Sequence, residues 1–187
     1  MTPSPIHRHH QSGSSLIEVL VAILLLSFGM LSLGAMMSFA VQMPKLSGYR
    51  ATAVNLASSH IERMRANPGQ PGFQNGDYDR SSYDGTFNTI TLPDCPYPTC
   101  TGLSLAAWDN AATQRAVRRE LPAGGILMRR DNSGGITSTT VGNLWIMWQE
   151  PSTYAALNPS SSDNCPTEIT GTYTDPRPRC LYVRFKL

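Results

Sequence analysis

The chain has 187 residues, a length typical of one domain with or without an appendage. Charged residues make up 15 % of it, below the roughly 25 % usual for soluble domains. The mean hydropathy of -0.21 excludes a protein that crosses a membrane many times. The formal net charge is only +2, and no basic stripe or acidic tail is present. We therefore expect neither a nucleic-acid partner nor a cationic one.

An uncharged apolar block occupies residues 19–41, VLVAILLLSFGMLSLGAMMSFAV. As a helix this block would be roughly 34 Å long, against about 30 Å for the hydrocarbon core of a bilayer. The block is longer than the roughly 7–15-residue core of a cleaved signal peptide. The rest of the chain is too polar to bury such a helix inside a soluble fold. The block therefore predicts a helix that spans a membrane.

A polar leader, residues 1–13, precedes the segment SSLIE, so Glu18 lies near the start of the hydrophobic segment. A carboxylate costs about 2.5–3.5 kcal/mol at the bilayer centre and less near the interface. Two interpretations follow. Glu18 either reaches water at the interface, or it is buried and requires a cationic partner. A free amine at Ser14 would be such a partner if the chain were cut after Gly13.

The run GSSLIEVLVA, which starts at Gly13, resembles the class III signal of type IV prepilins and pseudopilins. The resemblance implies that a prepilin peptidase cuts after Gly13 and methylates the new amino terminus at Ser14. It implies that the hydrophobic segment stays on the mature chain and that Glu18 is the residue needed for assembly. Ser14 departs from the family pattern, in which the first mature residue is usually Phe.

An ordinary secretory signal is the alternative to this interpretation. Ser38-Phe39-Ala40 fits a small-x-small cleavage site, and a cut there would leave Val41 as the first residue. The amino-terminal residue of the mature chain distinguishes the two, because a pilin begins at Ser14.

A helical pattern resumes after Pro44 and runs to the stop signal Asn67-Pro68-Gly69. We expect one long helix from about Ser15 to Ala66, in which Pro44 can introduce a kink. Two helices hinged at Pro44 are the alternative. Apolar residues form one stripe at helical spacing, and the histidine and arginines are placed largely elsewhere, with His60 as a surface residue. The stripe consists of Leu46, Ala53, Leu56, Ala57, Ile61 and Met64.

The segment from Leu56 to Asn67, which contains LA and IERMRAN, resembles the PilV-type minor pilins, the type IV pilus modification family. The resemblance implies an α+β, type IV pilin-like fold. In it a long N-terminal helix, transmembrane in its first half, packs on a small antiparallel β-sheet head. The expected regions are a prepilin leader peptide (1–13), a transmembrane and filament-core helix (14–43), its amphipathic continuation (44–67) and a periplasmic globular head (68–187).

Within the head, residues 69–92 are predicted to be loop, with a short strand only at Thr86–Leu92. The acids of this loop could suggest calcium, but their spacing does not match an EF-hand, and surface turns explain them better. Residues 151–179 are also expected to be loop. A helix is expected at Leu103–Leu121 and a hairpin turn at Asp131–Gly135. The predicted strands are Ile126–Arg130, Ile136–Val141, Leu144–Gln149 and Cys180–Leu187.

Four cysteines are present, at Cys95, Cys100, Cys165 and Cys180. Four cysteines allow three connectivities, and the spacing of the first two also suits some zinc sites. No CxxC pair or nearby histidine completes a zinc site, so no metal is expected. Because the head should lie outside the cytoplasmic membrane, disulfides are favoured. We expect the pairs Cys95–Cys100 and Cys165–Cys180.

No catalytic constellation occurs in the sequence, so we expect neither an enzyme nor a cofactor. The family resemblance implies a minor pilin of a type IV pilus that helps to prime assembly and contributes to tip adhesion. Its partners would be prepilin peptidase, other minor pilins, the major pilin and the bacterial inner membrane. The alternatives are a minor pseudopilin of a type II secretion system and an adhesin-like binding head on a membrane stalk.

Overall fold

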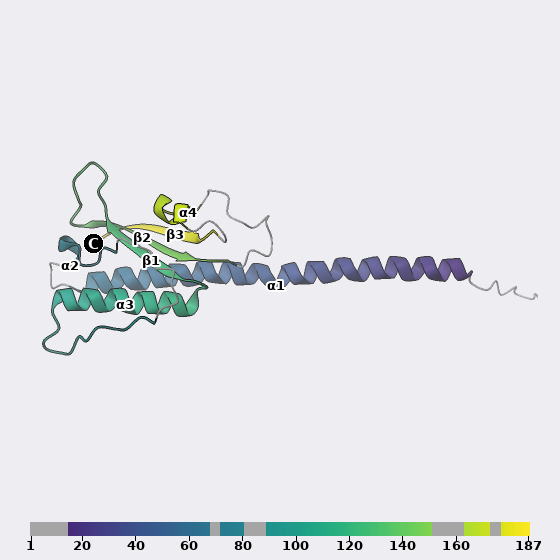
Figure 1. Ribbon diagram of the computed structural model, residues 1–187, viewed down its shortest axis with the longest axis horizontal. Coiled ribbons are helices and arrows are strands. Elements are labelled where there is room, and N and C mark those ends of the chain that lie inside the picture. The colour runs from purple at the N-terminus through teal and green to yellow at the C-terminus, as the bar shows by residue number, and fades with distance from the viewer. Residues whose placement is uncertain (1–14, 68–71, 81–88, 151–162, 173–176) are drawn as a thin grey trace, which may run out of the picture. The chain divides into compact units, whose positions relative to one another are not determined.

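The computed structural model describes residues 15–67, 72–80, 89–150, 163–172 and 177–187 (Figure 1). The chain divides into two compact units, Met1–Lys45 and Leu46–Leu187. Helix α1 (Leu16–Ala66) contains Pro44 within its length, so the expectation of one helix is confirmed and the hinged pair is not found. The α+β class, with a long amino-terminal helix and a small antiparallel sheet, is also confirmed.

In the first unit, α1 begins with the backbone N–H groups of Glu18 and Val19 donating to the carbonyl of Ser15. Among the described residues, α1 is the helix long and apolar enough to cross a membrane, and its most apolar window is unburied. The hydroxyls of Ser27 and Ser32 donate to backbone carbonyls one turn earlier. These local bonds satisfy the two hydroxyls within the helix, as a lipid environment requires.

The second unit contains a three-stranded antiparallel sheet in the order β1 (Gly125–Arg130), β2 (Val141–Trp148), β3 (Arg179–Lys186). The predicted small antiparallel sheet is therefore confirmed. Helix α3 (Gly102–Glu120) matches the predicted second helix. It begins where the Thr101 hydroxyl accepts a hydrogen bond from the backbone N–H of Ser104, a standard N-cap.

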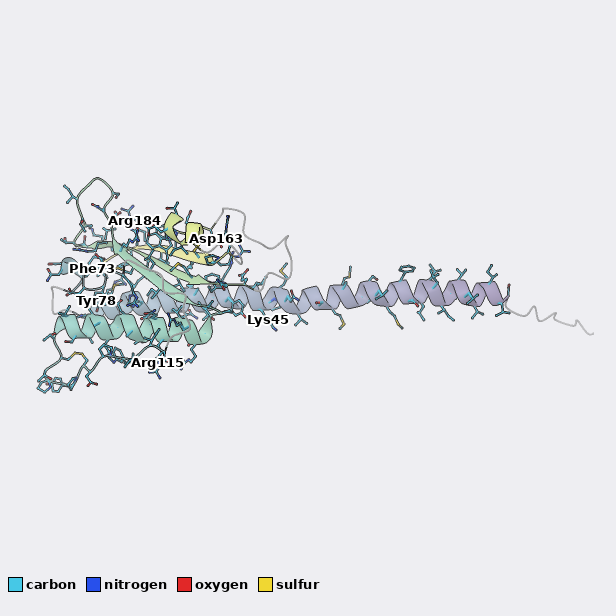
Figure 2. All side chains as sticks on the ribbon, viewed as in Figure 1. Lys45, Phe73, Tyr78, Arg115, Asp163 and Arg184 are labelled. Atoms are coloured by element: carbon cyan, nitrogen blue, oxygen red, sulfur yellow. A yellow bond between two sulfur atoms is a disulfide. The ribbon has the colours of Figure 1, made fainter. Side chains whose placement is uncertain are left out.

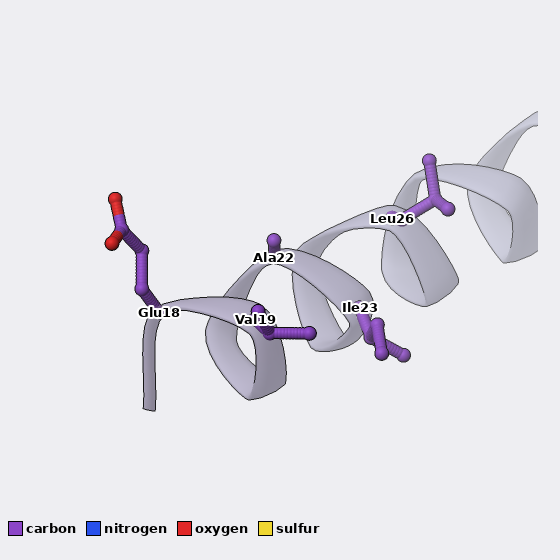
Figure 3. Close-up of a pocket in the computed structure, with 5 residues that line it drawn as sticks. All are labelled: Glu18, Val19, Ala22, Ile23 and Leu26. Atoms are coloured by element: carbon purple, nitrogen blue, oxygen red, sulfur yellow. The ribbon is translucent and has the colours of Figure 1, made fainter. Parts of the chain in front are cut away.

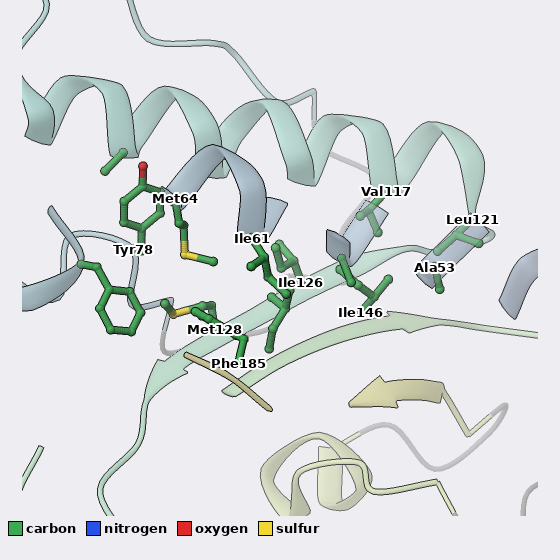
Figure 4. Close-up of a cluster of buried hydrophobic side chains, with 14 of the residues drawn as sticks. Ala53, Ile61, Met64, Tyr78, Val117, Leu121, Ile126, Met128, Ile146 and Phe185 are labelled. Carbon is green, nitrogen blue, oxygen red and sulfur yellow. The ribbon is translucent and has the colours of Figure 1, made fainter. Parts of the chain in front are cut away.

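The core of this unit lies where the second half of α1, helix α3 and the inner face of the sheet meet (Figure 4). The apolar stripe of α1 enters it, as its spacing predicts. Alternate residues of each strand face it because strand side chains alternate between the two faces. Its buried members include Ala53, Ala57, Ile61, Met64, Val117, Leu121, Ile126, Met128, Leu144, Ile146, Trp148 and Phe185.

The outer face of the sheet carries a second, smaller core. Leu127 and Met147 pack there against Ile169 of helix α4 (Thr167–Thr172). The rings of Trp145 and Tyr182 lie 5.1 Å apart beside this cluster, and the Trp145 indole N–H donates to the carbonyl of Asn164. Trp145 therefore contributes to a small core on the outer face of the sheet.

The predicted strand Ile136–Val141 is wrong. The register of the sheet places Arg130, the last residue of β1, opposite Gly142, so residues 136–140 have no strand to pair with. They belong to the connection, which is closed by the Ser138 N–H donating to the carbonyl of Asp131. Strand β2 instead runs unbroken from Val141 to Trp148.

Three other loop and strand predictions need correction. Residues 89–92 of the predicted strand Thr86–Leu92 are not a strand, and the remainder lies outside the described residues. Strand β1 makes an isolated bridge from Met128 to Arg80 instead. Two short helices, α2 (Gly72–Asn75) and α4, occur where only loop was expected. Helices of four and six residues are too short to give a sequence periodicity.

The structure joins Cys95 to Cys100 and Cys165 to Cys180, the pairs expected from the sequence. The second bond ties the segment before α4 to the first residues of β3. The chain-entropy treatment makes the larger loop more stabilising, about 3 kcal/mol for a closed loop of about 15 residues and about 2 kcal/mol for about 6.

Replacing Cys165 and Cys180 together with serine should lower the free energy of unfolding of the head by about 3 kcal/mol, and replacing Cys95 and Cys100 together by about 2 kcal/mol. Urea unfolding followed by tryptophan fluorescence measures both. Free thiols in the untreated wild-type protein would contradict both pairings.

Candidate functional site

The first turn of α1 presents one carboxylate on an otherwise apolar helix surface. Glu18, Val19, Ala22, Ile23 and Leu26 line a pocket along this surface (Figure 3). Glu18, Ala22 and Leu26 recur at intervals of four and therefore share one face. A carboxylate in the first turn also interacts favourably with the positive end of the helix dipole.

Glu18 is the predicted assembly residue that the structure describes, and it is exposed. Gly13 and Ser14, the predicted cleavage and methylation positions, lie outside the described residues. The four cysteines lie in the second unit and form the two disulfides described above.

Residues 8–34 match the prokaryotic N-terminal methylation motif. This match supports a type IV pilin-like protein. The motif belongs to type IV prepilin-like chains, and it implies processing by prepilin peptidase and association with a membrane or a pilus. Together with the apolar helix, it suggests membrane anchoring. No curated protein and no solved structure matched the chain in the corresponding comparisons.

Pilin-type chains are generally structural rather than enzymatic, and within the described ranges no group of three or more His, Cys, Asp or Glu side chains could hold a metal ion. Two acids of the second unit, Asp79 and Asp131, have arginine partners. Asp79 accepts hydrogen bonds from the backbone N–H and the Nε of Arg130. Asp131 forms an ion pair with Arg184, which Figure 2 labels.

The second unit contains a buried polar network that the sequence did not predict. His60 is fully buried rather than on the surface, and its Nδ1 lies 2.8 Å from the Thr113 hydroxyl of α3. The spacing does contain the signal, because His60 adjoins Ile61 and stands one turn beyond Ala57 in the apolar stripe. A lone histidine on a helix is expected at the surface, but the position of His60 beside the apolar stripe indicates burial.

Tyr78, which lies in the turn after α2 beside α1 and α3, connects the network (Figure 2). Its hydroxyl donates to Asp109 Oδ2 over 2.8 Å and accepts from the amide of Asn67 over 3.0 Å. The same Asn67 amide donates to the carbonyl of Gly102 at the start of α3. These bonds join the end of α1, the turn after α2 and the first turns of α3.

Burial changes the acid–base behaviour of this network. Burial and the nearby Arg63 lower the pKa of His60 from 6.5 to about 4. Burial also raises the pKa of Tyr78 above its ordinary value, and burial is the main cause of the raised pKa of Asp109. In each case removal from water disfavours the charged form.

A second group of charges fixes the far end of the sheet. Arg179 at the start of β3 pairs with Glu150 over 2.9 Å and with Asp163 over 3.4 Å. All three side chains are nearly buried. Arg50 of α1 lies 3.7 Å from the other oxygen of Asp163. The arrangement holds the segment next to the Cys165–Cys180 bond against β3.

Proposed function

We propose that this chain is a minor pilin of a type IV pilus, cut after Gly13 by prepilin peptidase, methylated at Ser14 and active in priming pilus assembly. The observation that supports it most is the single carboxylate of Glu18 in the first turn of an apolar helix, inside a methylation motif that covers residues 8–34. The proposed head, residues 68–187, lies in the periplasm and later on the pilus. Its second role is adhesion at the tip.

The physical basis of the proposal is charge pairing in an apolar surrounding. A filament core made of helices such as α1 has a low dielectric constant, so an unpaired ammonium group there is unfavourable. Glu18 would neutralise the amino terminus of a neighbouring subunit. Breaking a buried pair by removing one partner typically costs about 3–5 kcal/mol, because the other charge stays buried and unpaired.

Replacing Glu18 with Gln tests this role. We expect an unchanged amount of the chain in the inner membrane, because the apolar helix remains. We expect at least a tenfold fall in the sheared-filament fraction and in cross-links to other minor pilins, since a tenfold change corresponds to about 1.4 kcal/mol. Quantitative immunoblotting of the two fractions measures the effect.

The matched control is Glu62→Gln. Glu62 is an exposed acid on the same helix whose partner is Arg65, within the second unit. It should leave both fractions unchanged. Glu18→Gln filaments with the normal amount of the chain would refute the proposed role.

A minor pseudopilin of a type II secretion system would carry the same amino-terminal motif. The ERMRAN segment at residues 62–67 favours the pilus, because it is the part that resembles PilV-type minor pilins. Deleting the gene separates the two functions. Loss of pili supports the proposal, whereas normal pili with loss of a secreted protein would replace it by the secretion-system function.

A further inference from the structure

Beside the apolar core, α1 and α3 also meet through buried polar side chains. We call His60, Asn67, Tyr78, Asp109 and Thr113 the α1–α3 seam. All five are less than 9 % exposed, and His60 is at 0 %. A polar contact this deep is stable only while its groups keep their hydrogen-bond partners.

His60 is the member of the seam that an added proton would disturb most. Its Nδ1 faces the Thr113 hydroxyl, which can accept or donate, so that contact survives protonation. Its Nε2 is buried and has no hydrogen-bond partner among the described residues. An imidazolium needs acceptors for two N–H groups, and Nε2–H would have none.

The charges around His60 do not compensate for this. On its own helix Arg63 lies one turn away, and its guanidinium carbon is 5.6 Å from the centre of the Trp108 ring. The turn after α2 places the ring of Tyr78 6.0 Å from the imidazole. On α3, Asp109 is the nearby acid, and it already accepts the hydrogen bond of Tyr78 and interacts with Arg63.

Other charged groups on the packed elements are engaged elsewhere. The acids of the turn after α2 are Asp77 and Asp79, and Asp79 is held by Arg130 of β1. An imidazolium at position 60 would therefore lie near the positive charge of Arg63, while Asp109 already accepts the hydrogen bond of Tyr78.

We propose that the α1–α3 seam is an acid-sensitive joint whose sensor is His60, so that protonating its imidazole opens the contact between α1 and α3. The sequence offers one histidine that can act as this sensor. The other histidines are at positions 7, 9 and 10, so His60 is the one histidine of residues 14–187. The joint lies within the second unit, Leu46–Leu187, and the proposal holds whether the chain serves a pilus or a secretion system.

The sign and size of the effect follow from linkage. A base whose pKa is lower in the folded state stabilises that state above its unfolded pKa, and the stabilisation is lost as the pH falls. With values of 6.5 unfolded and about 4 folded, the equilibrium constant for opening rises roughly 30-fold between pH 7.5 and pH 5. The raised pKa of Asp109 acts in the opposite direction and reduces this factor.

Hydrogen exchange of the full chain in detergent micelles at pH 7.5 and pH 5 tests the joint. After correction for the intrinsic pH dependence of exchange, we expect peptides from α3 to open about 30-fold more at pH 5, and peptides from β2 to change less. His60→Gln keeps a group that can hydrogen-bond to Thr113 but cannot take up a proton in this range. It should abolish the increase. An equal increase in the variant, or none in the wild type, would overturn the proposal.

A second measurement on the unaltered chain protects the test against a variant that does not fold. NMR of the His60 imidazole gives the pH at which it titrates. A midpoint below pH 5, reached together with the opening of α3, supports the joint. A midpoint near 6.5 with α3 still protected means that the proton is accommodated without opening and overturns it.

Discussion

Replacing Gly13 with Glu should leave the chain uncut at the proposed site between Gly13 and Ser14. The resemblance to prepilins implies cleavage after Gly13, and a glycine before the cut has no side chain to hinder the approach of a peptidase to the backbone. The uncut chain still inserts, because residues 19–41 are unchanged. It has no new amine at Ser14, so the proposed pairing with Glu18 of a neighbour is lost and the chain is absent from filaments.

The control for this experiment is Ser12→Glu, which adds the same charge next to the glycine and keeps the glycine itself. It should be cut normally. Amino-terminal sequencing and intact mass give the result, with Ser14 as the first residue of the wild type and of the control. A first residue of Val41 in the wild type would contradict the pilin interpretation and indicate an ordinary secretory signal.

Replacing Leu144 with Ala should lower the free energy of unfolding of the head by about 2–5 kcal/mol. Leu144 is 0 % exposed at the centre of β2, with Met128 of β1 and Val183 of β3 as its partners in the register. Its removal loses transfer free energy and leaves a cavity that the strands on both sides keep open. This loss is a large fraction of the total free energy of unfolding, which is about 5–15 kcal/mol for a typical folded protein.

The same change at Leu103 is the control. Leu103 is 61 % exposed in the first turn of α3, so Leu103→Ala should alter the stability by less than about 0.5 kcal/mol. Urea unfolding followed by tryptophan fluorescence measures both variants, since all three tryptophans lie in the second unit. Equal effects of the two substitutions would show that the sheet does not form the core described here.

Much of the fold was predictable because its signals are local. The stop at Asn67-Pro68-Gly69 placed the end of α1 correctly, since proline and glycine act on their own backbone. Helix α3 and strands β1 and β3 were found within one or two residues for the same reason. The prediction of a strand at Ile136–Val141 was wrong because a strand forms only where a partner strand lies opposite. The sequence of residues 136–141 gives no information on where the partner β1 ends, which is at Arg130.

The candidate functional residues likewise fall into those that a local motif identifies and those that only the tertiary structure identifies. The signal around Gly13 and Glu18 is a linear motif and was recognised from the sequence, although the roles of these residues stay predictions. The surroundings of His60 were not recognised. Its partner Thr113 is distant in the chain, and no local pattern states that α3 will cover that face of α1.

The sequence alone was sufficient to predict a helix that can span a membrane at residues 19–41, because composition and length define such a helix. The same holds for Glu18 at its start. Only the tertiary structure decided which polar groups are buried, because burial is a property of the elements packed around a residue. His60 is an example: the sequence shows only a histidine on a helix, whereas the packed elements around it bury its side chain and lower its pKa to about 4.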